Sequence, residues 1–132
     1  MKVNNIITEG KRKKAIARAV LSPGKGFVTI NGRALQYYGD PLLQLRIAEP
    51  LTLAGDAVKN VNIDISLFGG GVSGQADAAR LAVARALVVH DKKLEGVFDE
   101  YDRFLLVADV RQNESCKPND SKPRAKRQKS YR

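Results

Sequence analysis

Apolar and polar positions alternate along two segments of the chain, and an alternation with a period of two predicts β-strands. Within residues 15–21, three alanines and a leucine share one face, while charged and larger aliphatic residues share the other. Within residues 60–68, four aliphatic side chains lie on one face and polar side chains lie on the other. Both apolar faces are predicted to pack against a common core.

Two more strands are predicted from turn signals and from an apolar run. Residues 22–26 combine Pro and Gly as turns do, so residues 27–30 are predicted to return beside residues 15–21 as a hairpin. An Asn-Gly pair then ends the returning strand. Residues 104–110 are nearly all apolar, which predicts a last strand in the centre of the sheet.

A short helix is predicted after Asp40. An acidic N-cap followed by Pro41 at the first helical position is typical of a helix start. Pro50 is predicted to end this helix, because a proline disfavours helical geometry in the residue before it. For residues 51–59, a linking turn and a continuation of the helix both remain open.

The longest helix is predicted from about residue 74 to His90, with Ser73 as its N-cap. Its core-facing stripe consists of small and aliphatic residues at helical spacing, namely Ala79, Ala82, Val83, Ala86 and Leu87. Their small size predicts close packing against a sheet. Asp91 is predicted to cap a further short helix that runs through residues 94–98.

The predicted elements follow the order β-β-α-β-α-α-β, and a tail comes last. This order predicts an α/β (α+β) two-layer sandwich with its helices on one face of the sheet. A chain of 132 residues has room for one such domain and an extension.

Basic residues gather at the two ends of the chain. The formal net charge is +9, and residues 1–18 contribute six basic groups against one acid, whereas residues 19–116 are close to neutral. Residues 117–132 contain one acid and seven basic residues, which are Lys117, Lys122, Arg124, Lys126, Arg127, Lys129 and Arg132. They contain no Leu, Ile, Val, Phe or Met, so they bury too little apolar surface to fold alone. Such a segment indicates a polyanionic partner, of which nucleic acid is the commonest.

Several function classes are disfavoured by composition. We expect no membrane span and no secretory signal, because neither the chain nor its start contains the apolar run that each requires. Cys116 and His90 are single residues of their types, so we expect no disulfide, no zinc site and no cofactor. The crowded acids within residues 91–102 could hold a metal or serve as an acid/base pair, but a solvated surface is the preferred interpretation.

The segment Gly69-Gly70-Gly71-Val72-Ser73-Gly74 matches the pattern G-x-G-x-x-G between a predicted strand and a predicted helix. Dinucleotide-binding loops have this context, but the expected acid on a second parallel strand is missing. A tight strand-to-helix connection is the simplest alternative. A close approach to an RNA backbone, with helix amides facing a phosphate, agrees best with the basic ends.

Three tyrosines are candidates for contacts with nucleic acid. Tyr37 and Tyr38 could stack on bases or could cover the helix that follows. Tyr131 lies in the basic tail with no core to join, so stacking on RNA or hydrogen bonding to it is favoured.

Four stretches resemble the universal family of small-subunit ribosomal protein S-nine, in its archaeal and eukaryotic form. They are GKRKKAIARA (10–19), SPGKGFVTING (22–32), GGGVSGQADAARLAVARAL (69–87) and RAKRQKSYR (124–132). The resemblance implies a ribosomal protein S-five domain-two-like fold and no enzymatic activity. It implies a single globular RNA-binding domain at residues 1–110 and an extended basic tail at residues 111–132.

The resemblance also implies partners and site residues. Small-subunit ribosomal RNA in the head would contact Lys11, Arg12, Lys13, Lys14, Arg18, Gly70, Gly71, Ser73, Gln75, Lys122, Arg124, Lys126 and Arg127. The peptidyl-site tRNA would contact Lys129, Ser130, Tyr131 and Arg132. Neighbouring proteins of the head are further expected partners, whereas a membrane and a small-molecule substrate are not expected. The expected location is the cytoplasmic ribosome. Residues 112–116 are less basic than the family pattern, which weakens any expectation of RNA contacts there.

Two other functions remain open. One is a free-standing basic module that binds DNA or RNA, and the other is a small nucleotide-binding enzyme built on the glycine turn.

Overall fold

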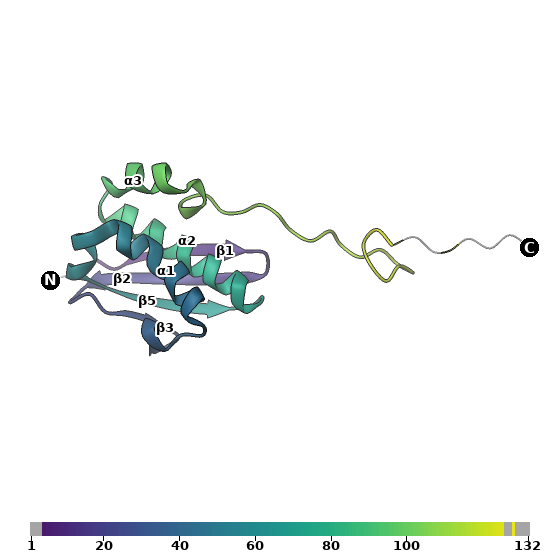
Figure 1. The fold of residues 1–132 in the computed structure, drawn as a ribbon, viewed down its shortest axis with the longest axis horizontal. Coiled ribbons are helices and arrows are strands. Elements are labelled where there is room, and N and C mark those ends of the chain that lie inside the picture. The colour runs from purple at the N-terminus through teal and green to yellow at the C-terminus, as the bar shows by residue number, and fades with distance from the viewer. Residues whose placement is uncertain (1–3, 126–127, 129–132) are drawn as a thin grey trace, which may run out of the picture.

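A five-stranded sheet with helices on one face forms the folded part of the chain (Figure 1). The computed structural model describes residues 4–125 and Gln128. The strands are β1 (Ile6–Arg12), β2 (Ala15–Pro23), β3 (Val28–Ile30), β4 (Arg33–Ala34) and β5 (Val61–Phe68). The α-helices are α1 (Pro41–Ala54), α2 (Val72–His90) and α3 (Leu94–Tyr101), and short 3-10 helices span Leu35–Tyr37, Gly55–Asn60 and Arg103–Leu105. The predicted two-layer α/β (α+β) class is confirmed.

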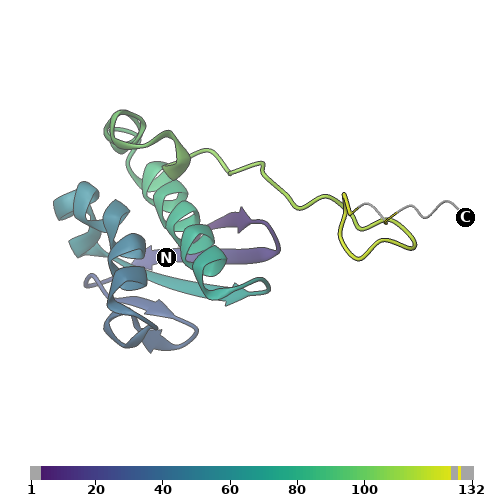
Figure 2. The ribbon, with the colours of Figure 1, turned by 45° about the vertical axis from the view of Figure 1, so that its right-hand side comes forward.

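The core lies between the sheet and α2, with α1 beside α2 on the same face (Figure 2). The alanine face of β2, the aliphatic face of β5 and the predicted stripe of α2 are all buried. Small residues allow the helix to lie very close to the sheet. A Cβ atom at Gly10 of β1 would come within 2.2 Å of the Ala78 carbonyl oxygen on α2. The prediction of close packing from the alanine-rich stripe is therefore confirmed.

The strand order is β1-β2-β5-β3-β4, so the predicted hairpin between residues 15–21 and 27–30 is wrong. β2 pairs antiparallel with β1 and with β5, and β3 pairs parallel with β5 on its other side. The connecting turn crosses the start of β5 instead of folding back on β2. The side-chain oxygen of Asn62 accepts hydrogen bonds from the backbone N–H groups of Lys25 (2.9 Å) and Phe27 (3.1 Å), which holds this crossing in place.

β1 is an edge strand that the sequence pattern did not predict. It pairs with β2 over its whole length, from Ile6 opposite Leu21 to Arg12 opposite Ala15. The charged residues in its second half obscure the alternation, because they lie on the outer face of the sheet or in polar contacts at its end.

Three helix boundaries that were predicted from single residues need correction. Asp91 is not the N-cap of α3, because the helix begins at Leu94 and Lys93 holds the cap position. Pro50 does not end α1 but lies buried inside it, so the helix continues to Ala54 and a 3-10 helix follows. Proline lacks an N–H group, so one hydrogen bond within the helix is missing at this position, while the ring of Pro50 is buried. Ser73 is not the N-cap of α2, because the helix begins at Val72 and Gly71 holds the cap position.

The predicted last strand at residues 104–110 is wrong. The chain forms the 3-10 helix Arg103–Leu105 and then continues without regular structure, with Leu105 buried and Val110 87% exposed. The carboxylate of Asp102 accepts the backbone N–H of Phe104 (3.0 Å) and starts this helix. The apolar run thus reflects one buried leucine and its neighbours rather than pairing in the sheet. Within the described residues, no helix is long and apolar enough to cross a membrane.

Candidate nucleic-acid interface

The basic turn between β1 and β2 and the glycine turn before α2 lie side by side, although more than fifty residues separate them in the chain. A pocket of about 540 Å³ between them is lined by Arg12, Lys13, Lys14, Gly70, Gly71, Val72, Ser73, Gly74, Gln112 and Asn113. Most of the N-terminal basic residues and the glycine turn, which the resemblance assigned to RNA, therefore share one surface. Gln112 and Asn113 belong to the nearly neutral segment for which the expectation of RNA contacts was weakened, and only the fold brings them here.

The first two glycines of the turn are required by packing. Gly69 and Gly70 have φ values of +75° and +62°, which side-chain-bearing residues rarely adopt. A Cβ atom at Gly69 would come within 2.5 Å of the Lys14 carbonyl oxygen, and one at Gly70 within 2.8 Å of the Ala15 backbone nitrogen. The match to a dinucleotide-binding pattern is thus explained by the fit of this turn against the β1–β2 hairpin. Gly71 differs, because the space around its Cα is open.

The N-terminus of α2 presents its first backbone N–H groups at this pocket. Its first turn contains no acidic residue, and the cap position makes no side-chain hydrogen bond. Gln75 instead donates its side-chain amide to the Gly69 carbonyl oxygen (3.0 Å) and closes the glycine turn. A helix N-terminus carries a partial positive charge, so it adds to the charge of the neighbouring lysines.

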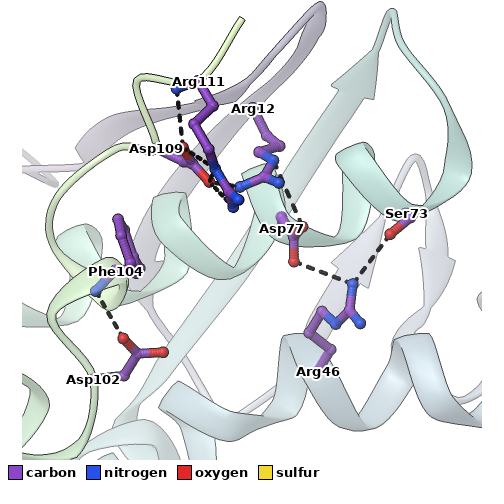
Figure 3. A network of polar contacts seen from close by, with 8 residues as sticks. All are labelled: Arg12, Arg46, Ser73, Asp77, Asp102, Phe104, Asp109 and Arg111. Atoms are coloured by element: carbon purple, nitrogen blue, oxygen red, sulfur yellow. Dashed lines mark hydrogen bonds and ion pairs between the residues drawn. The ribbon is translucent and has the colours of Figure 1, made fainter.

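Arg12 is held by acidic residues of the protein itself (Figure 3). Its guanidinium forms an ion pair with Asp109, whose side chain is 9% exposed, and lies 4.0 Å from the carboxylate of Asp77. Arg111 also donates to Asp109 (2.6 Å). The charge of Arg12 is therefore largely compensated, and its contacts fasten the segment after α3 to the domain.

The same network reaches the start of α2 from the side of α1. Arg46 on α1 donates to the Ser73 hydroxyl (3.2 Å) and to Asp77 (3.2 Å), as Figure 3 also shows. Ser73 is thus engaged by an arginine of the protein, while its exposure leaves it at the surface of the pocket. Nothing in the sequence pattern identified Arg46, Asp77 or Asp109, because each acts through a contact distant in the chain.

The lysines of the turn are exposed, in contrast to Arg12. Lys13 and Lys14 form the two-residue connection between β1 and β2, and Lys11 precedes them on the outer side of β1. Lys11 has Glu9 as a neighbour at 3.9 Å, an exposed and therefore weak pair. Lys13 and Lys14 are the strongest candidates for phosphate contacts in this pocket.

A second cluster of charges joins the helices. The guanidinium of Arg80 on α2 contacts Glu49 on α1 (2.6 Å) and Asp102 after α3 (3.1 Å). The N–H of Phe104 and the hydrogen bond from Arg80 lower the pKa of Asp102, although desolvation acts in the opposite direction. Desolvation alone would lower the pKa of Arg80, but its two carboxylate partners raise it.

The crowded acids within residues 91–102 serve the fold or face solvent. Asp91 accepts the backbone N–H of Lys93 (3.1 Å) just before α3, and Asp102 binds Arg80. Glu95, Asp99 and Glu100 are exposed. In the part of the chain that the structure describes, no three His, Cys, Asp or Glu side chains come together as a metal site would require.

The remaining predicted residues do not join the pocket between the turns. Arg18 is exposed in the middle of β2, on the face of the sheet without helices, opposite Glu9 and Ser66. Lys122 and Arg124 are exposed in the tail, where Arg124 pairs with Glu114 (2.7 Å). Lys126, Arg127, Lys129, Ser130, Tyr131 and Arg132 lie outside the described residues.

The two adjacent tyrosines have different environments. Tyr38 packs against the hydrophobic core, and burial raises the pKa of its hydroxyl. Tyr37 is exposed. Tyr38 therefore has a packing role, as in the alternative that these tyrosines cover the helix that follows, whereas Tyr37 is free to stack on a base.

Comparison with known proteins identifies the family. The family described as "Ribosomal protein S9/S16" matches residues 10–132, which include the basic turn, the glycine turn and the tail. The chain belongs to this family. Members of the S9/S16 family are ribosomal proteins rather than enzymes, so the alternative of a nucleotide-binding enzyme is excluded for this chain.

Similar relatives come from archaea, which agrees with the resemblance to the archaeal and eukaryotic form of the family. The proteins named "Small ribosomal subunit protein uS9" from Thermoplasma volcanium and Thermoplasma acidophilum are 49% and 50% identical to this chain over 129 residues. The matches cover 96% of this chain and 98% and 100% of those relatives. The protein of the same name from Pyrobaculum aerophilum is 43% identical, over 96% of this chain and 91% of that relative.

Proposed function

We propose that this protein is a structural constituent of the small ribosomal subunit and binds its ribosomal RNA through the pocket between the two turns. Membership of the S9/S16 family supports the ribosomal assignment. The observation that carries the RNA interface is the position of Lys13 and Lys14 beside the uncapped N-terminus of α2. Lysine ammonium groups and helix amides are both suited to phosphate oxygens.

The pocket suits a folded RNA backbone rather than a base sequence. Lys13 and Lys14 lie in a two-residue turn between paired strands, and Gly71 leaves open space through which a sugar-phosphate chain can approach the helix. Contacts of this kind position RNA but do not distinguish bases. Specificity then comes from the shape of the RNA and from the placement of the folded domain.

The tail extends this function beyond the domain. We assign residues 1–110 to the RNA-binding domain and residues 111–132 to an extended tail, and the last buried core residue, Leu105, supports this division. When extended, the last sixteen residues of this tail, 117–132, can span up to roughly 50 Å at about 3.3 Å each. Lys129, Ser130, Tyr131 and Arg132 would contact the anticodon stem-loop of the peptidyl-site tRNA, an assignment that the family match through Arg132 supports.

Fractionation of a cell extract on a sucrose gradient tests the ribosomal assignment. The chain is expected to migrate with the small subunit after EDTA separates the subunits and after a moderate salt wash. A chain found only in the light fractions would contradict the proposal and favour a free nucleic-acid-binding module.

Truncation tests the assignment of the tail separately. Subunits carrying a chain without Lys129–Arg132 are expected to assemble as the full chain does but to bind peptidyl-site tRNA more weakly. A chain that lacks Lys117–Lys122 but keeps residues 129–132 is the control. It shortens the tail without removing the residues proposed to contact tRNA, and so shows whether tail length alone affects tRNA binding. Unchanged tRNA affinity after removal of the last four residues would mean that they do not contact tRNA.

A further inference from the structure

The face of the sheet that carries no helix holds an exposed aromatic residue next to basic side chains. Phe68, the last residue of β5, is 50% exposed and lies on this face, opposite to the buried Leu67. Strand pairing places Phe68 directly beside Ile16 of β2, and Ile16 beside Lys11 of β1. Phe68 and Ile16 therefore form a flat apolar surface with a lysine at its outer edge.

A second basic residue lies one row further into the sheet. Arg18 pairs in register with Ser66, two residues before Phe68, so it is the diagonal neighbour of the ring on the same face. Lys14 directly precedes β2 and lies at the same end of the sheet as Phe68 and the glycine turn. Three basic side chains thus surround the phenylalanine.

Two acidic residues lie on this face, and neither pairs in register with Phe68. Glu9 stands opposite Arg18 on the edge strand, 3.9 Å from the Lys11 ammonium group, and Asp64 stands two rows from Phe68, where it accepts a hydrogen bond from Thr29 (2.9 Å). Lys14, which is exposed, adds positive charge at the end that carries Phe68. That end continues into the pocket between the two turns.

We infer that Phe68 is a stacking platform for an unpaired nucleotide of RNA, with Ile16 beneath the same base and Lys11, Lys14 and Arg18 on the adjoining phosphates. Every base offers a π-face to an exposed aromatic ring, and basic neighbours hold the backbone that carries it. The charge of this face favours RNA over an apolar protein surface as the occupant. The inference rests on the proposed RNA-binding function and adds a second contact surface that engages a base rather than a phosphate.

Binding of the full-length protein to two RNA probes tests this inference. The first probe is a single strand of twelve nucleotides, either oligouridylate or oligoadenylate. The second probe is an RNA duplex of equal length, and both are measured at one fixed salt concentration. Phe68→Ala is expected to weaken binding to the single strands at least about fivefold, because loss of stacking removes a base contact, and to leave binding to the duplex unchanged. Phe68→Tyr is expected to retain the affinity.

Tyr101→Ala is the matched control. Tyr101 ends α3, is 55% exposed and lies among acidic residues, so its removal is expected to change neither affinity. Thermal unfolding of each variant shows whether the fold is kept. Phe68→Leu keeps an apolar side chain without a π-face and should lose single-strand affinity without unfolding the domain.

The possible results separate this inference from the proposed function. In one result, Phe68→Ala and Phe68→Leu leave the affinity for single strands unchanged, while the double variant Lys13→Glu, Lys14→Glu lowers the affinity for both probes. That result overturns the stacking platform and supports the phosphate interface. If the double lysine variant also changes nothing, the proposed interface fails. If the Phe68 variants bind RNA normally but enter reconstituted small subunits poorly, the open face contacts a protein, and the inference is overturned.

Discussion

The two basic regions of this protein have similar charge and different structural settings. In the turn between β1 and β2, the backbone is held by strand pairing and by the glycine turn packed against it. In the described part of the tail, from residue 111 to residue 125, the chain forms no helix or strand. The number of basic residues in a cluster therefore does not show how many of their charges are available to a ligand. Arg12 is engaged by Asp109 and Asp77, whereas Lys13 and Lys14 are exposed.

The largest effect is expected from removal of the tail. Deletion of residues 117–132 removes seven basic groups and should flatten the dependence of RNA affinity on salt by up to about 5 units of log-log slope. Titration of ribosomal RNA at several salt concentrations measures this slope. The double variant Lys13→Glu, Lys14→Glu should change the slope far less while still lowering affinity. An unchanged slope after the deletion would mean that the tail does not contact RNA.

The glycine turn offers a sharp test of the region whose backbone is held by strand pairing. Gly70→Ala places a Cβ atom against the backbone of Ala15 at a positive φ value, so the free energy of unfolding should fall by roughly 2 kcal/mol or more. Gly71→Ala is the matched control, because open space surrounds its Cα and its φ is −103°, and should cost less than about 1 kcal/mol. Denaturant unfolding measures both. Equal losses would show that the hairpin does not constrain this turn.

The partly buried ion pair between Arg12 and Asp109 should contribute more to stability than the exposed pair between Arg124 and Glu114. Asp109→Asn deprives Arg12 of its close carboxylate partner in a mostly buried setting and should lower the free energy of unfolding by about 1–3 kcal/mol. Glu114→Gln removes the exposed partner of Arg124 in the tail and should cost less than about 0.5 kcal/mol. A larger loss at Glu114 would reverse the comparison between the two regions.

The smallest effect concerns pH. The pKa of Asp102 is lowered by the N–H of Phe104 and by Arg80, so the unfolded chain takes up this proton at a higher pH than the folded chain. Its contribution to stability is therefore present above about pH 4 and is lost as the pH falls through the lowered pKa. Asp102→Asn should flatten the dependence of the melting temperature on pH in this acidic window. Asp99→Asn, an exposed change nearby, should not, and equal curves for Asp102→Asn and the unaltered chain would contradict the assignment.

Local sequence patterns correctly predicted the features that depend on whether each residue is buried or exposed. The alternation in β2 and β5 and the alanine stripe of α2 were correct, because burial on one face imposes its own period on the sequence. The strand predicted at residues 104–110 was wrong, because an apolar run indicates that residues are buried but does not show that they pair in a sheet. Leu105 is buried against the helices without any strand pairing.

The two-layer class, the long helix and the basic ends could be predicted from the sequence alone, and the family followed from resemblance. Three features became clear only in the folded protein: β5 lies between β2 and β3, Lys13 and Lys14 meet the start of α2, and Arg12 turns inward to Asp109. The physical reason is the range of the interactions. Periodicity and composition record whether each residue is buried, whereas strand order and ion pairs depend on hydrogen bonds and contacts between residues that are distant in the chain.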